Sequence, residues 1–248
     1  TIRGNVDRML AREETMSSPL LDDQMDKVLP VVSVAGSDSA MLDNTLEFLM
    51  MAGMDLPLAV MACIPEPWKE DKTISRSKRD LYQYYATLME PWDGPASILF
   101  SVGDVVGAGL DRNGLRPSRY YVTRDGRLIL ASEVGVLDIP SEQIVEKSRL
   151  QPGRMLLVDT TQGRIIGDDE LKESYAARQP YGEWLDRNLL HLKDLPIPNR
   201  RVERHTREGL HRLQKAFGYT YVDVRNTILP MARTGAEPTA AMGTDIPL

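Results

Sequence analysis

Short strand-like runs between residues 96 and 167 constrain the fold of this chain more than any other feature. They come in pairs, and a turn containing glycine separates the members of each pair. The pairs are ASILFS with VVGAGL, RYYVT with RLILAS, and RMLLVDT with RIIG. Because apolar runs joined by tight turns are typical of antiparallel hairpins, the region is predicted to form an antiparallel meander.

Helical patterns flank this region on both sides. The clearest is AGSDSAMLDNTLEFLMMAG, where Ser37 can cap the N-terminus, Asp38 lies in the first turn and Gly53 ends the helix. The other predicted helices are at residues 5–14, in DLPLAVMACIPEPW before its prolines, at 77–89 and at 168–178. Helices that pack against an antiparallel sheet give the α+β fold class.

The chain is predicted to contain two domains. Residues from about 180 to 200 are rich in proline and charge, which is typical of a linker. Helices are predicted near 206–216 and 221–231. We therefore expect a first domain at 1–190, a linker at 191–204 and the beginning of a second domain at 205–248. The sequence opens at Thr1 without methionine, which fits either a processed N-terminus or a stretch of a longer chain.

Charge and cysteine content exclude several classes of protein. The 248 residues include 30 Lys and Arg and 36 Asp and Glu, a net charge of −6 with no basic block, so nucleic acid is not an expected partner. No apolar run approaches the roughly 18 residues that span a bilayer, so no membrane is expected. A single cysteine excludes a disulfide framework and fits a reducing cytoplasm.

The residues offer few candidates for nucleophilic or metal chemistry. Cys63 would be the strongest nucleophile as a thiolate, but it lies in the apolar run LAVMACIP, which favours a buried hydrophobic role. The three histidines, His191, His205 and His211, are too scattered along the chain for a metal site. No metal is therefore expected.

Asp38 has two interpretations. A carboxylate in the first turn of a helix is favoured by the helix dipole, which explains it as a helix-start residue. It can equally be presented at an edge of the fold, where it would bind a cationic group such as an α-ammonium. Local sequence does not decide between them.

The loop before RYYVT carries Arg112, Arg116 and Arg119. Arginine binds phosphate or carboxylate through paired donors, so these residues are candidate anion ligands. A structural role, in which they hold loop carbonyls and acidic neighbours, is favoured because Asn113-Gly114 is typical of a tight, fixed loop.

Several stretches resemble the large subunit of glutamate synthase. They are TIRGN with RMLARE, AGSDSAMLDNTLEFL, MACIPEPW, YYATLMEPWDGPASILFS, GAGLDRNGLRPSRYYVTRDGRLILASEVGVLDIP, LQPGRMLLVDT, and QKAFGYT with ILPMARTGAEPTAAMGTDIPL. They occur in order along the whole sequence. The stretch LDRNGLRPSRYYV also resembles, more loosely, other class II glutamine amidotransferases.

The resemblance implies part of an N-terminal-nucleophile glutaminase domain, an αββα sandwich. In that family a cysteine at the mature N-terminus attacks glutamine, and an Asn-Gly pair forms the oxyanion hole. Both lie upstream of TIRGN, so no catalytic residue is expected in this stretch, which alone should be inactive. The complete enzyme passes ammonia to 2-oxoglutarate on FMN beside an iron–sulfur cluster, and takes electrons through a flavin-containing small subunit or ferredoxin. No cofactor is expected here.

The resemblance also assigns residues. Asp38 maps to the aspartate that holds the α-ammonium of L-glutamine. Arg112, Asn113, Gly114 and Arg116 map to a hairpin that braces the glutamine pocket. Residues from 205 onward map to the start of the central domain, which with the remaining domains of the parent chain is an expected partner.

Two alternatives to this function differ in class. Thr1 would be the nucleophile of a threonine hydrolase if processing exposed it at a strand start. Without any nucleophile, the chain would be a non-catalytic glutamine-binding or interaction module.

Overall fold

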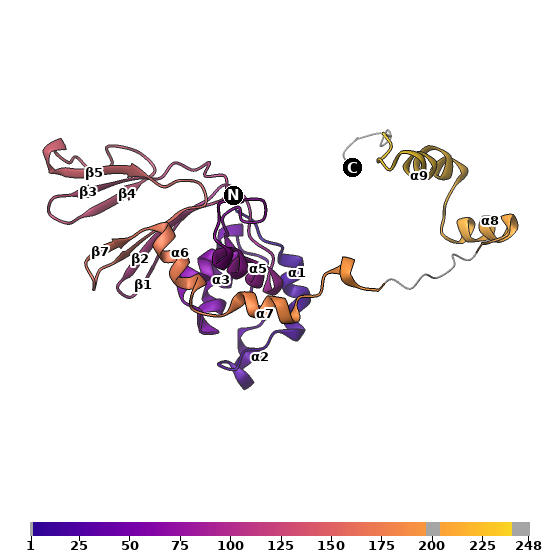
Figure 1. The fold of residues 1–248 in the computed structure, drawn as a ribbon, viewed down its shortest axis with the longest axis horizontal. Coiled ribbons are helices and arrows are strands. Elements are labelled where there is room, and N and C mark those ends of the chain that lie inside the picture. Colours follow the sequence, from indigo (N-terminus) through magenta and orange to yellow (C-terminus); the bar gives the residue numbers. More distant parts are fainter. Residues whose placement is uncertain (1, 197–203, 240–248) are drawn as a thin grey trace. The chain divides into compact units, whose positions relative to one another are not determined.

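A computed structural model describes residues 2–196 and 204–239, which belong to two compact units, Thr1–Leu190 and His191–Leu248 (Figure 1). The helices of the first unit are α1 (Val6–Arg12), α2 (Met25–Val28), α3 (Asp38–Met51), α4 (Leu56–Cys63), α5 (Arg76–Leu88), α6 (Asp168–Ala176) and α7 (Tyr181–Asn188). Its strands are β1 (Ser97–Val102), β2 (Val105–Leu110), β3 (Arg119–Thr123), β4 (Leu128–Ala131), β5 (Ile144–Arg149), β6 (Met155–Asp159) and β7 (Arg164–Ile166).

The helices begin and end where local signals place them. The Ser37 hydroxyl accepts a hydrogen bond from the Ala40 backbone N–H at 3.3 Å, so it caps α3 as predicted. Gly53 follows the helix with a φ of +90°, which a residue with a side chain rarely adopts. The predicted helices at 5–14, 77–89 and 168–178 and the apolar helix before the prolines are confirmed as α1, α5, α6 and α4.

The strands form two antiparallel sheets, with the orders β1-β2-β6-β7 and β4-β3-β5. The predicted hairpins β1–β2, β3–β4 and β6–β7 are confirmed, and so is the α+β class. The prediction of a single meander is wrong, because β2 pairs with β6 and not with β3. Strand β5 was not predicted, since five of its six residues are exposed and it has no apolar alternation.

The main core lies between the helices and one face of the larger sheet. The whole of α4 is buried, and Ala59, Cys63 and Leu81 are fully inaccessible. On the other face of the larger sheet, Ala108 and Leu156 pack with Tyr120 of the smaller sheet to form a second, smaller cluster. Figure 1 shows the smaller sheet on the side of the larger sheet away from the helices.

Helix α7 lies inside the stretch that the sequence favours as a linker, so that prediction is wrong for 181–188. Its Tyr181 is only 4% exposed and lies 5.2 Å from Tyr84 of α5, measured between ring centroids. Trp184 lies 5.3 Å from the same tyrosine ring. Two aromatic residues one turn apart therefore attach α7 to α5, despite the polar residues around them. Residues 197–203 of the predicted linker lie outside the described residues.

The second unit contains α8 (Arg207–Ala216) and a π-helical segment, Asp223–Ile228, that continues into α9 (Leu229–Thr234). The Thr206 hydroxyl caps α8 by accepting from the Gly209 N–H at 3.1 Å. Both predicted helices are confirmed. Among the residues that the structure describes, no helix is long and apolar enough to cross a membrane.

Candidate functional site

Asp38 lies at the N-terminal end of α3, on a tight turn. The turn closes through a 2.9 Å hydrogen bond from the Gly36 N–H to the Ser33 carbonyl. The Asp38 carboxylate is 30% exposed, and its Oδ1 lies 3.9 Å from Nε of Arg3, whose own side chain is 80% exposed. The two side chains are in loose contact, so the carboxylate remains accessible to a ligand.

The residues after Thr1 run in extended conformation beside the segment that precedes β1. Arg3 forms an isolated antiparallel bridge with Asp93, with backbone hydrogen bonds of 2.7 and 2.9 Å. Gly4 lies against the indole of Trp92, where an added Cβ atom would come within 2.4 Å of the ring. Only glycine fits there without displacing the ring. Arg3 and Gly4 are thereby held against Trp92 and Asp93, and the Arg3 side chain reaches Asp38 from there.

Arg112 joins the same arrangement through Asp93. Its Nε and Nη2 donate to the two carboxylate oxygens of Asp93 at 2.9 and 2.7 Å, a bidentate pair. The hydrogen bond from Arg112 holds the pKa of the Asp93 carboxyl below its ordinary value. A chain of contacts therefore runs from Asp38 through Arg3 and Asp93 to Arg112, and links residues that are distant in the sequence.

Replacing Arg112 by glutamine is expected to raise the pKa of Asp93 toward its ordinary 3.8, because the charged donor is lost. The depressed pKa means that this pair stabilises the fold above pH 3.8 and that the contribution disappears as pH falls through the folded-state pKa. Titration of the side-chain carboxyl by carbon NMR measures this. Arg127→Gln, which breaks the pair with Asp125 instead, should leave the titration unchanged. An Asp93 pKa that is the same in wild type and Arg112→Gln would contradict the assignment.

The Asn113-Gly114 loop is fixed by Asp111, which is 1% exposed. Its carboxylate accepts from three backbone N–H groups, those of Ala96, Asn113 and Gly114, at 3.0, 2.9 and 3.2 Å. Gly114 has a φ of +60°, and a Cβ atom there would lie 2.7 Å from Pro152. The loop is therefore tight and rigid, and neither property depends on a side chain of Asn113.

Arg116 is not brought to Asp38. It lines a separate hollow of about 260 Å³ with Arg119 and Arg149. The structure thus divides the arginines of this loop, because Arg112 is paired with a carboxylate while Arg116 and Arg119 face a common space.

Cys63 is inaccessible in the core, and burial raises the pKa of its thiol to about 12. A thiol that stays protonated and out of contact with solvent is no nucleophile, so the hydrophobic role is confirmed. No group of three His, Cys, Asp or Glu side chains converges on a metal position within 2–196 and 204–239. Thr1, the alternative nucleophile, lies outside the described residues.

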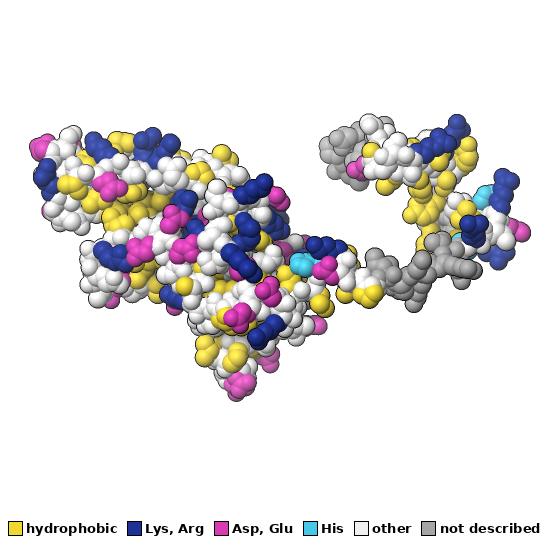
Figure 2. All heavy atoms as spheres, viewed as in Figure 1, with side chains coloured by type: hydrophobic (Ala, Val, Ile, Leu, Met, Phe, Trp, Pro, Cys, Tyr) yellow, Lys and Arg dark blue, Asp and Glu magenta, His cyan; other side chains and the backbone are white. Residues whose placement is uncertain are grey.

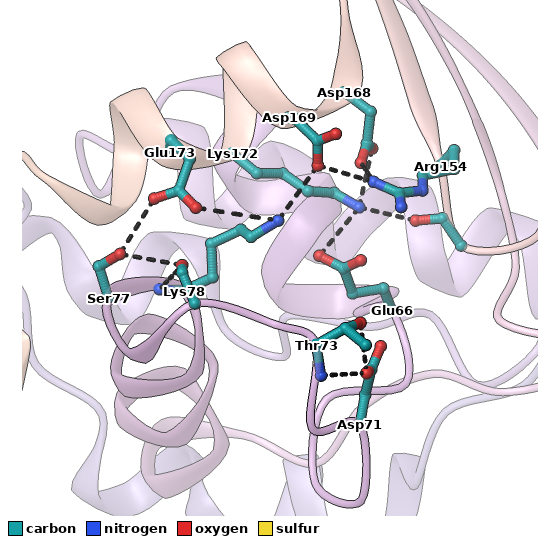
Figure 3. Close-up of polar contacts among 12 residues, drawn as sticks. Glu66, Asp71, Thr73, Ser77, Lys78, Arg154, Asp168, Asp169, Lys172 and Glu173 are labelled. Atoms are coloured by element: carbon teal, nitrogen blue, oxygen red, sulfur yellow. Dashed lines mark hydrogen bonds and ion pairs between the residues drawn. The ribbon is translucent and has the colours of Figure 1, made fainter.

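A buried network of charges escaped the sequence analysis (Figure 3). Lys172 of α6 is 1% exposed, and its Nζ lies 2.8 Å from Asp168, 3.1 Å from Glu66 and 2.7 Å from the Gly153 carbonyl. Asp168 also pairs with Arg154 at 2.5 Å. The Gly153 N–H in turn donates to the Asp111 carbonyl at 2.9 Å. Through Gly153 and Asp111, the network therefore also holds the Asn113-Gly114 loop in place.

Comparison with known proteins identifies the family of this chain. Residues 1–184 match the family described as class II glutamine amidotransferases, and residues 212–248 match the glutamate synthase central domain. The chain is 46% identical to the glutamate synthase [NADPH] large chain of Bacillus subtilis over 248 residues, 100% of this chain. It is 41% identical to ferredoxin-dependent glutamate synthase 2 of Synechocystis over 100% of this chain, and 43% identical to glutamate synthase [NADH] of Schizosaccharomyces pombe over 99%.

The chain spans only 12–16% of the length of these relatives. Their names therefore describe much longer proteins. The family match, by contrast, covers residues 1–184 of the first unit, which include Asp38, the Asn113-Gly114 loop and the charge network that supports it. On this match, the chain belongs to the class II glutamine amidotransferases.

Proposed function

We propose that this chain is part of a glutamate synthase large chain, in which it contributes one side of the glutamine site. The observation that carries the proposal is 41–46% identity to glutamate synthases from three organisms over at least 99% of this chain. The reaction is hydrolysis of the glutamine side-chain amide to glutamate and ammonia, and the ammonia is passed on to 2-oxoglutarate.

Asp38 is the residue that would bind substrate. An α-ammonium carries three donors, and the Asp38 carboxylate is a partly exposed acceptor whose contact with Arg3, at 3.9 Å, is easily displaced. Arg3 and the Asp93–Arg112 pair would then fix the chain beside the ligand. Asn113 and Gly114 would form a rigid floor, since Asp111 holds their backbone N–H groups.

The nucleophile in this proposal is not Cys63, because that thiol is buried in the core. This sequence also does not fit an iron–sulfur cluster, because a cluster is held by several cysteine thiolates and the sequence contains one cysteine. The cluster of the complete enzyme would therefore be bound by other residues. The electron donor, a flavin-containing small subunit or ferredoxin, is also set elsewhere, since NADPH, NADH and ferredoxin forms resemble this stretch about equally.

The domain division belongs to the same proposal. Residues 1–190 would form part of the glutamine domain, residues 191–204 the linker, and residues 205–248 the start of the central domain. The separate compact units and the family match at 212–248 support it.

Asp38→Asn in the intact protein is expected to raise the KM for glutamine roughly 10- to 100-fold, since a hydrogen bond to a charged group contributes about 1.5–3 kcal/mol. Glutamate formation is measured with glutamine and, separately, with ammonia supplied directly. Asp43→Asn makes the same change in charge within α3 and is the control.

The rate at which the Asp38→Asn variant forms glutamate from added ammonia should equal that of wild type, because ammonia does not need the α-ammonium site. Unchanged glutamine kinetics in Asp38→Asn would remove this residue from the site. A wild-type protein that binds glutamine without releasing ammonia would favour the non-catalytic binding module.

A further inference from the structure

The smaller sheet carries an unexplained cluster of arginines. Arg116 lies in the loop before β3, Arg119 begins β3 and Arg149 ends β5, and all three line the hollow of about 260 Å³. Figure 2 shows basic side chains gathered over this sheet. In residues 2–196 and 204–239, none of the three forms an ion pair, whereas Arg112, Arg127, Arg154 and Arg164 all do.

Two of these arginines are directly opposite each other. Arg119 pairs with Arg149 in the antiparallel register of β3 and β5. Like charges at directly opposed positions destabilise a sheet, and Arg116 adds a third positive charge at the same hollow. This arrangement becomes favourable when a negative group lies between the guanidinium groups.

An orphaned hydroxyl points to the same ligand. Ser118 also lines the hollow, yet it is only 3% exposed, and its Oγ has no hydrogen-bond partner within the described parts of the chain. Buried hydroxyls nearly always have a partner. The Ser118 backbone is fixed, because its carbonyl accepts from the Leu150 N–H at 3.0 Å. A donor with no acceptor, held in place beside three cations, suits an oxyanion.

The walls of the hollow are rigid before any ligand binds. Gly114 packs against Pro152, and both residues line the hollow. Asp111 fixes the loop that leads to Arg116 through its bonds to backbone N–H groups. A site that is already formed loses little conformational entropy on binding.

We propose that this hollow binds a small dianionic oxyanion, a phosphate group or a short dicarboxylate, through Arg116, Arg119, Arg149 and the Ser118 hydroxyl. Guanidinium groups bind both kinds of anion through paired hydrogen bonds, and the volume admits a molecule of this size. The proposal goes beyond glutamine hydrolysis and does not depend on it.

The test is isothermal titration calorimetry of the intact protein with inorganic phosphate and with succinate, in chloride buffer at constant ionic strength. We expect saturable binding of at least one anion. The anion with the lower Kd shows whether the site prefers a phosphate group or a dicarboxylate. Arg119→Gln with Arg149→Gln should weaken it at least tenfold, and Ser118→Ala roughly threefold or more, since each loses donors to a charged group. Arg127→Gln, in the same sheet but paired with Asp125, should bind as wild type does.

A second variant separates folding from binding. Arg119→Lys with Arg149→Lys keeps the charge and loses the paired donors, so its affinity should fall between those of wild type and the glutamine variant. Absence of saturable binding by wild type, or equal affinity in wild type and the glutamine variant, would overturn the proposal.

Discussion

Replacing Lys172 by methionine is expected to lower the stability of the first unit by about 3–5 kcal/mol, the usual effect of removing one partner from a buried ion pair. Lys172 is 1% exposed, and its ammonium lies between Glu66 and Asp168, whose side chains are 11% and 10% exposed. Methionine fills a similar volume, so the loss comes from charge and not from a cavity. Among the described residues, Glu66 would keep as its side-chain partner the Tyr82 hydroxyl, which donates to it at 3.0 Å.

Hydrogen exchange of peptides that span β6 and α6, followed by mass spectrometry, measures this loss in the intact protein. Glu170→Gln is the matched control, because Glu170 lies on the same helix as Lys172. It breaks an exposed pair with Arg164 of β7, so it should leave the exchange close to that of wild type. Adding Glu66→Gln to Lys172→Met should recover part of the stability by removing the uncompensated carboxylate. Protection equal to that of the control would show that the network contributes little.

Replacing Asp111 by alanine is expected to cost about 3 kcal/mol or more, because it leaves backbone N–H groups without an acceptor at a buried position. One of these groups belongs to Ala96, which leads into β1, and the other to Asn113 in the loop. The Gly114 N–H would keep the backbone carbonyl of Asp111, at 3.0 Å. The substitution should therefore loosen the start of the larger sheet and the loop together. Peptides that cover 94–116 should exchange faster than in wild type.

Asp71→Ala provides the comparison for this experiment. Asp71 also accepts from a nearby backbone N–H, that of Thr73 at 2.8 Å, but in an exposed turn where water can replace it. Its loss should leave hydrogen exchange of the surrounding peptides close to that of wild type. If Asp111→Ala and Asp71→Ala had equal effects, burial of the Asp111 carboxylate would not matter for the loop.

Elements with local signals were predictable from the sequence. Ser37 and Gly53 mark the ends of α3, and the hairpin glycines mark their turns. The pairing of β2 with β6 was not predictable, because it depends on hydrogen bonds between segments that the local pattern does not connect. Helix α7 was missed for a related reason, since its attachment depends on Tyr84, which is distant in the sequence.

The candidate site divides in the same way. The assignment of Asp38 to the site comes from the resemblance and stays a prediction, whereas the turn residues predicted the tight loop that the structure has at Asn113-Gly114. Nothing in the sequence separated Arg112 from Arg116, because both are arginines of one loop and only the position of Asp93 distinguishes them. Lys172 follows the acidic run DDEL and looks like a solvated helix residue, so its burial appears only when Glu66 is brought to it by the fold.

The inaccessible thiol of Cys63 can serve as a built-in probe of how often the core opens. An alkylating reagent can reach the sulfur only when α4 separates from the rest of the core, so the rate of modification reports how often that separation occurs. Mass spectrometry of the peptide that carries Cys63 would give this modification rate, and with it the rate at which the core opens, without an engineered label.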